Sequence, residues 1–303
     1  MSVCGFTFVK NAVKLDFPLV ESIRSALPLC DKFVVVLGDC NDGTRELIER
    51  IGSSKIQIID SVWDETQKSG GRVYALETDK AFQAVGAEFE WCLYIQADEV
   101  LHEKDYPAIR NAINKWNEHT DVDGLLFKYY HFYGSYDYVG DTRKWYRNEI
   151  RMIRNDKTIQ SYRDAQGFRK QGQKLSVVPV DAAVYHYGWV RPPAIMQQKC
   201  DVVKQYYSGE IVEKKPVFEF DYAQRFDALT RFQGAHPEVM RRRIESKNWK
   251  IDVDTSKIRM KWKYKILYYF EKRTGIRLFE YRNYLINTKG LKLPLGRFRQ
   301  KPE

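Results

Sequence analysis

The sequence predicts an α/β protein with an open, mostly parallel sheet flanked by helices, and two observations lead to this fold class. Three short apolar runs, at 3–9, 33–37 and 91–95, have the composition of strands that are covered on both faces. Between these runs, apolar residues recur at helical spacing, so strand and helix alternate along the chain. Repeated strand–helix–strand units form a parallel sheet because each helix returns the chain to the same edge. The 303 residues, 44% of them hydrophobic, can bury a large core.

Local patterns justify the individual elements. Pro18 precedes apolar residues at helical spacing, as expected where a helix begins. Three valines at 34–36 favour a strand, and Asn41-Asp42-Gly43 has the chemistry of a turn. A Gly70-Gly71 step precedes another helical pattern. The expected order is strand 3–9, helix 19–27, strand 33–37, helix 44–51, strand 56–59, helix 72–87, strand 91–95 and helix 104–116.

The character of the chain changes after Gly124. Three further strands are expected, at 125–132, 149–153 and 182–187, separated by loops rich in Tyr, Arg and Gly. From Pro193 onward the pattern is helical. We therefore expect a sheet-bearing domain over 1–192 and a helical, basic C-terminal extension over 193–303.

Charge and cysteine content limit the compartment and the partners. The net charge of +10 is concentrated after Arg241, which would suit nucleic acid, anionic lipid or a phosphorylated substrate. Nucleic acid is not expected, because 40 acidic residues are interspersed and no nucleic-acid module is recognisable. Five cysteines without CxxC spacing favour a reducing cytosol. With no signal peptide and no long apolar run, we expect a cytoplasmic protein, with the inner face of the membrane as the alternative location.

The strand at 91–95 ends in polar residues that point to a ligand site. Gln96, Asp98 and Glu99 follow it directly, at the edge where parallel sheets bind ligands. A carboxylate there could hold a divalent metal against phosphate oxygens, and Gln96 could bind a ribose hydroxyl. Alternatively, an acidic residue at a strand end simply caps the next helix, and Asp98 considered alone fits both interpretations equally.

Other residues also have two interpretations. Asp39 follows a strand and could accept a hydrogen bond from a base or ribose, whereas Asp42 more simply forms the turn. Asp164 lies in a Gly-containing loop where a general base would be accessible, yet a surface pair with a neighbouring Arg is the commoner fate. His186 lies in an aromatic run typical of a core, although Arg191 and Lys199 nearby would suit a metal–diphosphate site.

The segment 260–287 mixes aromatic residues with many Lys and Arg. Such a segment could lie on an anionic membrane surface as an amphipathic helix. It could equally pack an apolar stripe on the main domain and leave its charges in water. We favour packing, because the aromatic residues are spread over more than one helical face.

Taken in order, these residues resemble the family 2 glycosyltransferases of the GT-A fold. The order begins with an N-terminal strand that ends in Lys10-Asn11. The run from Gly38 to Thr44 is similar to that family's D-x-S-x-D-G-T sequence, and Gln96-Ala97-Asp98-Glu99 is similar to its D-A-D-E sequence. The resemblance covers about residues 1 to 200, so 1–192 would be the GT-A domain. It implies an inverting, non-processive hexosyltransferase-like enzyme of cell-surface glycan synthesis, with a nucleotide-sugar donor, a UDP-sugar foremost, and a glycan or lipid-linked acceptor.

The resemblance also implies roles on the nucleotide side of the site. Phe8, Asn11 and Asp39 would line the nucleotide pocket. Arg72 would approach the ribose or diphosphate, and Gln96 the ribose. Gln96 replaces the first Asp of the family's D-x-D sequence, which removes one negative charge from the expected metal site.

Further roles are implied on the diphosphate side. Asp98 would ligate Mn²⁺ or Mg²⁺, with His186 as a further metal ligand. Arg191 and Lys199 would bind the diphosphate, and Asp164 would be the catalytic base. The main alternative is a non-catalytic GT-A-like protein that binds nucleotide-sugars and has a degraded metal site. A nucleotidyltransferase is a weaker alternative, because its Gly-rich N-terminal loop is missing.

Overall fold

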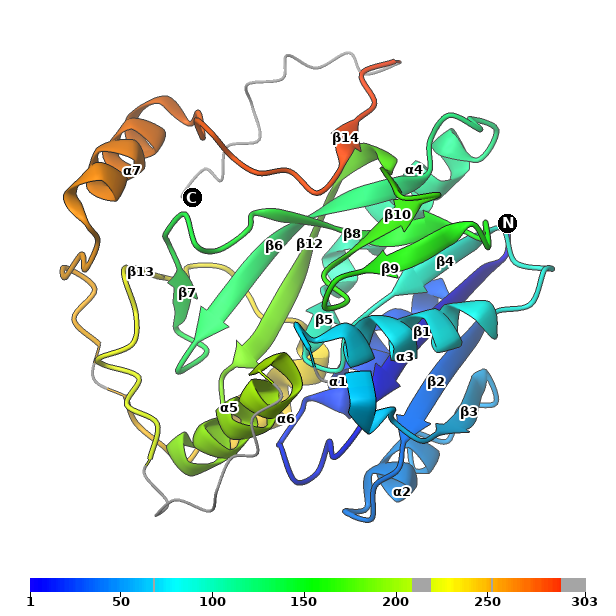
Figure 1. Ribbon diagram of the computed structural model, residues 1–303, viewed down its shortest axis with the longest axis horizontal. Helices are drawn as coiled ribbons and strands as arrows, with labels where there is room; N and C mark the ends of the chain where they lie inside the picture. Colours follow the sequence, from blue (N-terminus) through cyan, green and yellow to red (C-terminus); the bar gives the residue numbers. More distant parts are fainter. Residues whose placement is uncertain (68, 209–218, 252, 290–303) are drawn as a thin grey trace.

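The computed structural model describes residues 1–67, 69–208, 219–251 and 253–289, and its centre is one twisted sheet (Figure 1). Four neighbouring strands of this sheet are parallel, in the order β3-β2-β1-β4. Their bounds are Val3–Val9 for β1, Lys32–Gly38 for β2, Ile56–Ser61 for β3 and Trp91–Tyr94 for β4. The predicted α/β fold class and the parallel half of its sheet are confirmed.

Antiparallel strands extend the sheet beyond β4. The strand β8 (Asn148–Arg154) pairs antiparallel with both β4 and β6 (Gly124–Tyr133), and the long strand β12 (Ser176–Trp189) runs parallel to β6. Two short strands complete this half, β5 (Glu99–Leu101) beside β12 and β7 (Tyr138–Gly140) beside β6. Because β5 pairs with β12, His186 lies opposite Glu99 and therefore next to Asp98.

Apolar layers cover the sheet on both faces. Alternate residues of β2 enter different clusters, with Phe33 and Val35 on one face and Val34 and Val36 on the other. This alternation explains why the strand is apolar throughout. One face is covered by α1 (Leu19–Ala26), α2 (Thr44–Glu49) and α4 (Tyr106–Trp116). The other is covered by α3 (Arg72–Gln83) and by the small sheet of β9 (Ile159–Tyr162), β10 (Gly167–Lys170) and β11 (Gln173–Lys174).

The strand order reverses between β1 and β4, and this reversal places the site. The chain passes outward from β1 through β2 to β3, and then returns to the other side of β1 as β4. In open α/β sheets, ligands bind at the carboxyl ends of the strands at such a reversal. Here those ends carry Lys10 and Asn11 from β1, and Gln96 and Asp98 from β4.

The part of the chain after residue 192 is helical in α5 (Pro193–Ser208), α6 (Arg241–Glu245) and α7 (Trp262–Thr274). It also contributes two short strands to the sheet, since β13 (Leu229–Arg231) pairs with β7 and β14 (Leu285–Ile286) pairs with β12. Residues 209–218, 252 and 290–303 of the predicted extension lie outside the described residues. The domain division at 192/193 stays a prediction.

Polar contacts hold α7 against the rest of the protein. Tyr268 and Lys272 contact Asp141, and Glu271 pairs with Arg143. None of the residues of α7 is buried, and Trp262 is 75% exposed. The interpretation that an apolar stripe packs this segment on the main domain is therefore wrong for α7, while membrane contact stays a prediction. Among the described residues, no helix has both the length and the apolar character needed to cross a membrane.

Candidate functional site

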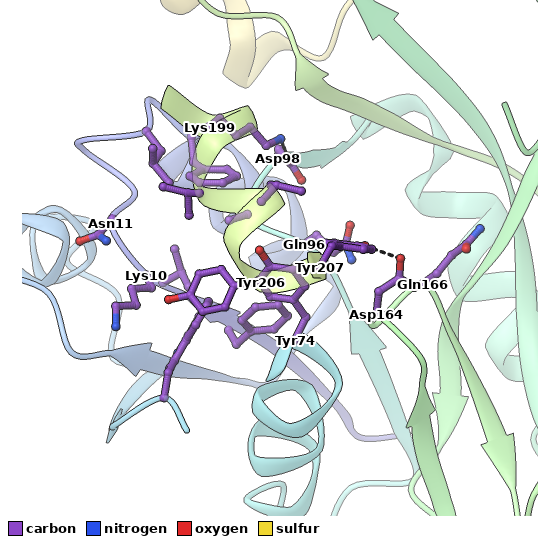
Figure 2. A pocket seen from close by; sticks show the side chains of 18 of the residues that line it. Lys10, Asn11, Tyr74, Gln96, Asp98, Asp164, Gln166, Lys199, Tyr206 and Tyr207 are labelled. Atoms are coloured by element: carbon purple, nitrogen blue, oxygen red, sulfur yellow. Dashed lines mark hydrogen bonds and ion pairs between the residues drawn. The ribbon is translucent and has the colours of Figure 1, made fainter. Parts of the chain in front are cut away.

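A cavity of about 300 Å³ lies at the carboxyl ends of β1 and β4, beneath α5 (Figure 2). The structure gathers most of the predicted site residues around it, although they come from four separate parts of the chain. The lining includes Phe8, Asn11, Gln96, Asp98, Asp164, His186 and Lys199. Their assigned roles stay predictions, but their proximity is established.

Three predicted residues do not line this cavity. The Asp39 side chain is 54% exposed and pairs with Lys10 at 2.7 Å, and the hydrogen bond from Lys10 lowers its pKa. Arg72 is exposed at the start of α3. Arg191 is fully buried behind the wall, where its Nε donates to the carbonyl of Leu15.

Asp98 is a buried carboxylate surrounded by cations. Its Oδ2 lies 3.0 Å from Lys199 Nζ and 3.7 Å from Arg191 Nη2. Burial alone would raise the pKa of Asp98, but the charges of Lys199 and Arg191 outweigh burial and hold it well below its usual range. An ionised carboxylate is therefore fixed at the end of β4, and Lys199 reaches it from α5.

Close packing holds the β12 side of this cluster. An added Cβ at Gly188 would lie 2.3 Å from His186 Nε2 and 2.9 Å from Asp98 Oδ2, so only glycine fits there. The carbonyl of Gly188 accepts a hydrogen bond from Lys199 Nζ at 2.8 Å. Gly188, two residues after His186, therefore allows β12 to lie close to Asp98.

Hydrogen bonds of His131 determine which nitrogen of His186 faces the cavity. His131 Nε2 lies 3.0 Å from the carbonyl of Tyr146, which can only accept, so this nitrogen carries the proton. Burial lowers the pKa of His131 well below its usual value, so its Nδ1 is an acceptor. His186 Nδ1, 3.3 Å away, must then donate. Since burial also lowers the pKa of His186, its Nε2 carries a lone pair toward Asp98 Oδ1, at 3.7 Å.

Asp98 and His186 can together offer one oxygen and one nitrogen to a divalent ion. Both facing atoms are acceptors, an arrangement that suits a shared cation. Among the described residues, no group of three or more His, Cys, Asp or Glu side chains could hold a metal. An ion here would therefore have two protein ligands and would depend on phosphate oxygens and water for the rest, as Mg²⁺ commonly does.

Asp164 lies in the turn between β9 and β10, and the turn is held from several sides. The residues that flank it, Arg163 and Ala165, have φ values of 58° and 64°, an uncommon conformation for residues other than glycine. Tyr207 of α5 donates to Asp164 Oδ2 at 2.5 Å, and Gln96 Nε2 donates to the carbonyl of Ala165 at 3.3 Å. The amide of Gln96 thus joins the end of β4 to the Asp164 turn.

The loop from Gly38 to Thr44 positions the neighbouring loop after β1. Thr44 Oγ1 accepts from the backbone of Ala12 at 2.8 Å, and Asp42 Oδ2 accepts from the backbone of Lys14 at the same distance. Asn11 between these loops and the cavity has a φ of 55°. Turn chemistry at Asp42 thus supports the cavity without contacting it.

An aromatic wall, of which the sequence analysis named only Phe8, forms the other end of the cavity. Phe8, Trp63, Tyr74 and Tyr206 contact one another with ring centroids 5.3 to 6.0 Å apart. Trp63 Nε1 is buried and has no hydrogen-bond partner among the described residues. The helical spacing from Lys199 through Tyr206 places both on one side of α5, a periodicity from which Tyr206 could have been found.

The burial of Glu149, which lines a neighbouring cavity, leads us to predict that the stability of the protein depends on pH. Its Oε1 accepts from Gln166, its Oε2 has no partner, and burial raises its pKa from 4.5 to about 8. Between these values the folded protein holds a proton that the unfolded chain lacks, so stability falls as pH rises. We expect the free energy of unfolding of Glu149→Gln, measured in urea relative to wild type, to rise by about 1–3 kcal/mol as the pH goes from 5 to 8.5. If the stabilities of wild type and Glu149→Gln changed with pH in the same way, the raised pKa of Glu149 would be refuted. Glu118→Gln, at an exposed glutamate, is the matched control.

Comparison with known proteins gives weak structural similarities only. No family model and no curated protein matches the chain. TarS from S. aureus is 15% identical, with 71% of this chain and 41% of that chain covered and a TM-score of 0.40. TarS 1–349 in complex with UDP is 16% identical, with 71% and 68% covered and a TM-score of 0.39. Glucosyl-3-phosphoglycerate synthase from Mycobacterium tuberculosis, in complex with Mn²⁺, UDP and phosphoglyceric acid, is 13% identical, with 43% of each chain covered and a TM-score of 0.29. This chain thus spans less than half of the first of these TarS chains.

Proposed function

We propose that the protein is an inverting glycosyltransferase that moves a sugar from a nucleotide-sugar donor, a UDP-sugar foremost, to a hydroxyl of a glycan or lipid-linked acceptor. One observation carries the proposal. A single cavity at the strand-order reversal has an ionised Asp98 with Lys199 at one end, an aromatic wall at another, and Asp164 where a second cavity adjoins it. The motif order typical of family 2 glycosyltransferases supports the same assignment.

The aromatic wall would receive the nucleobase and the Asp98 end the diphosphate. Phe8 and Tyr74 offer ring faces to a base, and the Trp63 ring extends this wall. Lys199 Nζ, 17% exposed, can approach phosphate oxygens while it keeps its contact with Asp98. Arg191 supports Asp98 from behind and does not reach the ligand.

The transfer step follows from the position of Asp164. Its carboxylate would take the proton from the acceptor hydroxyl as the acceptor oxygen attacks the anomeric carbon. The bond between that carbon and the diphosphate oxygen breaks on the opposite face, so the configuration inverts. Lys199 would stabilise the negative charge that develops on the departing nucleoside diphosphate.

Asp98 Oδ1 and His186 Nε2 would hold Mn²⁺ or Mg²⁺ at the diphosphate end. Such an ion supplies Lewis-acid stabilisation of the leaving diphosphate. His131 is a positioning residue in this arrangement, because its hydrogen bonds keep the lone pair of His186 directed at Asp98. The replacement of a second carboxylate by Gln96 gives the site a lower negative charge than a D-x-D sequence would.

A panel of nucleotide-sugars distinguishes this function from a binding protein that has lost catalysis. We expect one donor to raise the melting temperature in a metal-dependent manner, because a ligand that binds only the native state stabilises it. The same donor should release its nucleoside diphosphate when acceptor is present. Metal-independent binding without any release would favour the non-catalytic alternative, and no stabilisation by any nucleotide-sugar would refute both.

A further inference from the structure

A second and larger cavity, of about 810 Å³, adjoins the first. The two share Tyr146, Asp164 and Gln166 in their linings. The second cavity is bounded by residues 142–149, the β9–β10 turn, the start of α7 and residues 277–284. If Asp164 is the base of the proposed transferase, a ligand in this second cavity is placed to present a hydroxyl to it.

The lining of the second cavity carries excess positive charge. Seven cationic side chains face four acidic ones, and one of the acids is Glu149, whose burial raises its pKa to about 8. Three of the cationic residues, Arg143, Arg147 and Arg277, pair with Glu271. Three others, Arg163, Arg259 and Lys261, have no acidic partner among the described residues and are exposed.

Exposed aromatic rings line the same cavity as these three cations, of which Arg259 also donates to the carbonyl of Ala223. Phe279 is 90% exposed, Tyr281 67% and Tyr264 45%. Phe279 also has a φ of 56°, an outlier for a bulky residue that burial does not explain. Large apolar side chains kept in water around a cavity mark a binding surface. A ring face can cover the apolar C–H face of a sugar, while the cations bind negatively charged substituents.

We propose that the second cavity is the acceptor site and that the acceptor is an anionic glycan, one that carries phosphate, sulfate or carboxylate groups. The proposal rests on the proposed function, because this cavity is an acceptor site only if Asp164 is the catalytic base. Arg163, Arg259 and Lys261 bind the negative groups, and Phe279, Tyr281 and Tyr264 contact the sugar rings. Neutral glycans would fit the cavity but bind more weakly, because they lack the negative groups that its excess positive charge attracts.

The test compares two probes with the same sugar backbone, neutral cellotetraose and its negatively charged sulfated form, by calorimetry on the full chain. The sulfated probe should bind about tenfold more tightly, and its affinity should fall with salt because the contacts are charge–charge contacts. Lys261→Ala should weaken it by about fivefold. Lys289→Ala removes an equal charge on an 86% exposed side chain outside the cavity and should have no effect. UDP affinity should be unchanged in both variants.

Each outcome has a separate meaning. Equal affinity for the two probes, or an equal loss in Lys261→Ala and Lys289→Ala, would overturn the anionic class. Binding of UDP without binding of either probe would overturn the acceptor site and leave the donor function standing. Failure to bind UDP or any nucleotide-sugar would instead remove the proposed function, whatever the glycan result. Tighter binding of a random DNA duplex than of the sulfated glycan would replace the glycan with nucleic acid.

Discussion

Asp164→Asn is expected to lower the rate of sugar transfer by about 10²- to 10⁴-fold, the usual contribution of a positioned general base. The amide keeps the size of the side chain and can still contact Tyr207, but it cannot take a proton from the acceptor hydroxyl. The affinity for UDP should stay within about twofold, because Asp164 lies where the two cavities meet and away from the Asp98 end. Single-turnover kinetics with the donor identified in the panel would measure the loss.

A matched control separates this effect from a general loss of charge. Asp181, in β12, is 87% exposed, so Asp181→Asn removes the same charge outside either cavity and should retain full activity. Transfer at the wild-type rate by Asp164→Asn would exclude this residue as the base. Glu149, which also lines the second cavity and accepts from Gln166, would then be the group to examine.

The largest effect on stability is expected for Arg151→Met. Arg151 and Glu99 are both fully buried and form two hydrogen bonds of 2.6 and 2.7 Å between β8 and β5. Tyr129 also donates to Glu99. Removing the guanidinium leaves an uncompensated carboxylate in the core, which typically costs about 3–5 kcal/mol. Equilibrium urea unfolding measures the change.

A double variant distinguishes loss of the ion pair from loss of packing. Glu99→Gln combined with Arg151→Met removes the buried charge, so it should recover about half of the stability lost in Arg151→Met alone. If the double variant lost as much stability as the two single variants together, Glu99 and Arg151 would not be energetically coupled. The Asp164 turn would also loosen in Arg151→Met, because Arg151 Nη1 donates to the carbonyl of Gln166 at 3.3 Å.

The strands and the centre of the site follow from local sequence. Strands buried on both faces, such as β1 and β2, leave an apolar run that is visible in sequence, and the polar residues just after them must lie at the sheet edge. The predicted proximity of Asp98 and His186 is confirmed, although only the pairing of β5 with β12 brings them together. The helix predicted over 72–87 ends four residues early, at Gln83, where no helix stop marks the sequence.

Contacts between residues far apart in the chain could not be predicted from the sequence. Arg191 looked like a diphosphate ligand because it is cationic and near His186, yet it is buried and supports Asp98 from behind. Arg151 and Glu99 are 52 residues apart, so no local pattern predicts their ion pair. Tyr264 reaches the second cavity because polar contacts hold its helix α7 at Asp141 and Arg143, which are over 120 residues away in the sequence.

The most direct test of the account is a crystal structure of the protein with UDP and Mn²⁺. We predict the uracil against Phe8 and Trp63, the diphosphate within hydrogen-bond distance of Lys199, and an anomalous manganese peak between Asp98 and His186. A UDP molecule bound elsewhere, or a manganese peak away from Asp98 with the Lys199 contact unchanged, would contradict the assignment of this cavity as the donor site.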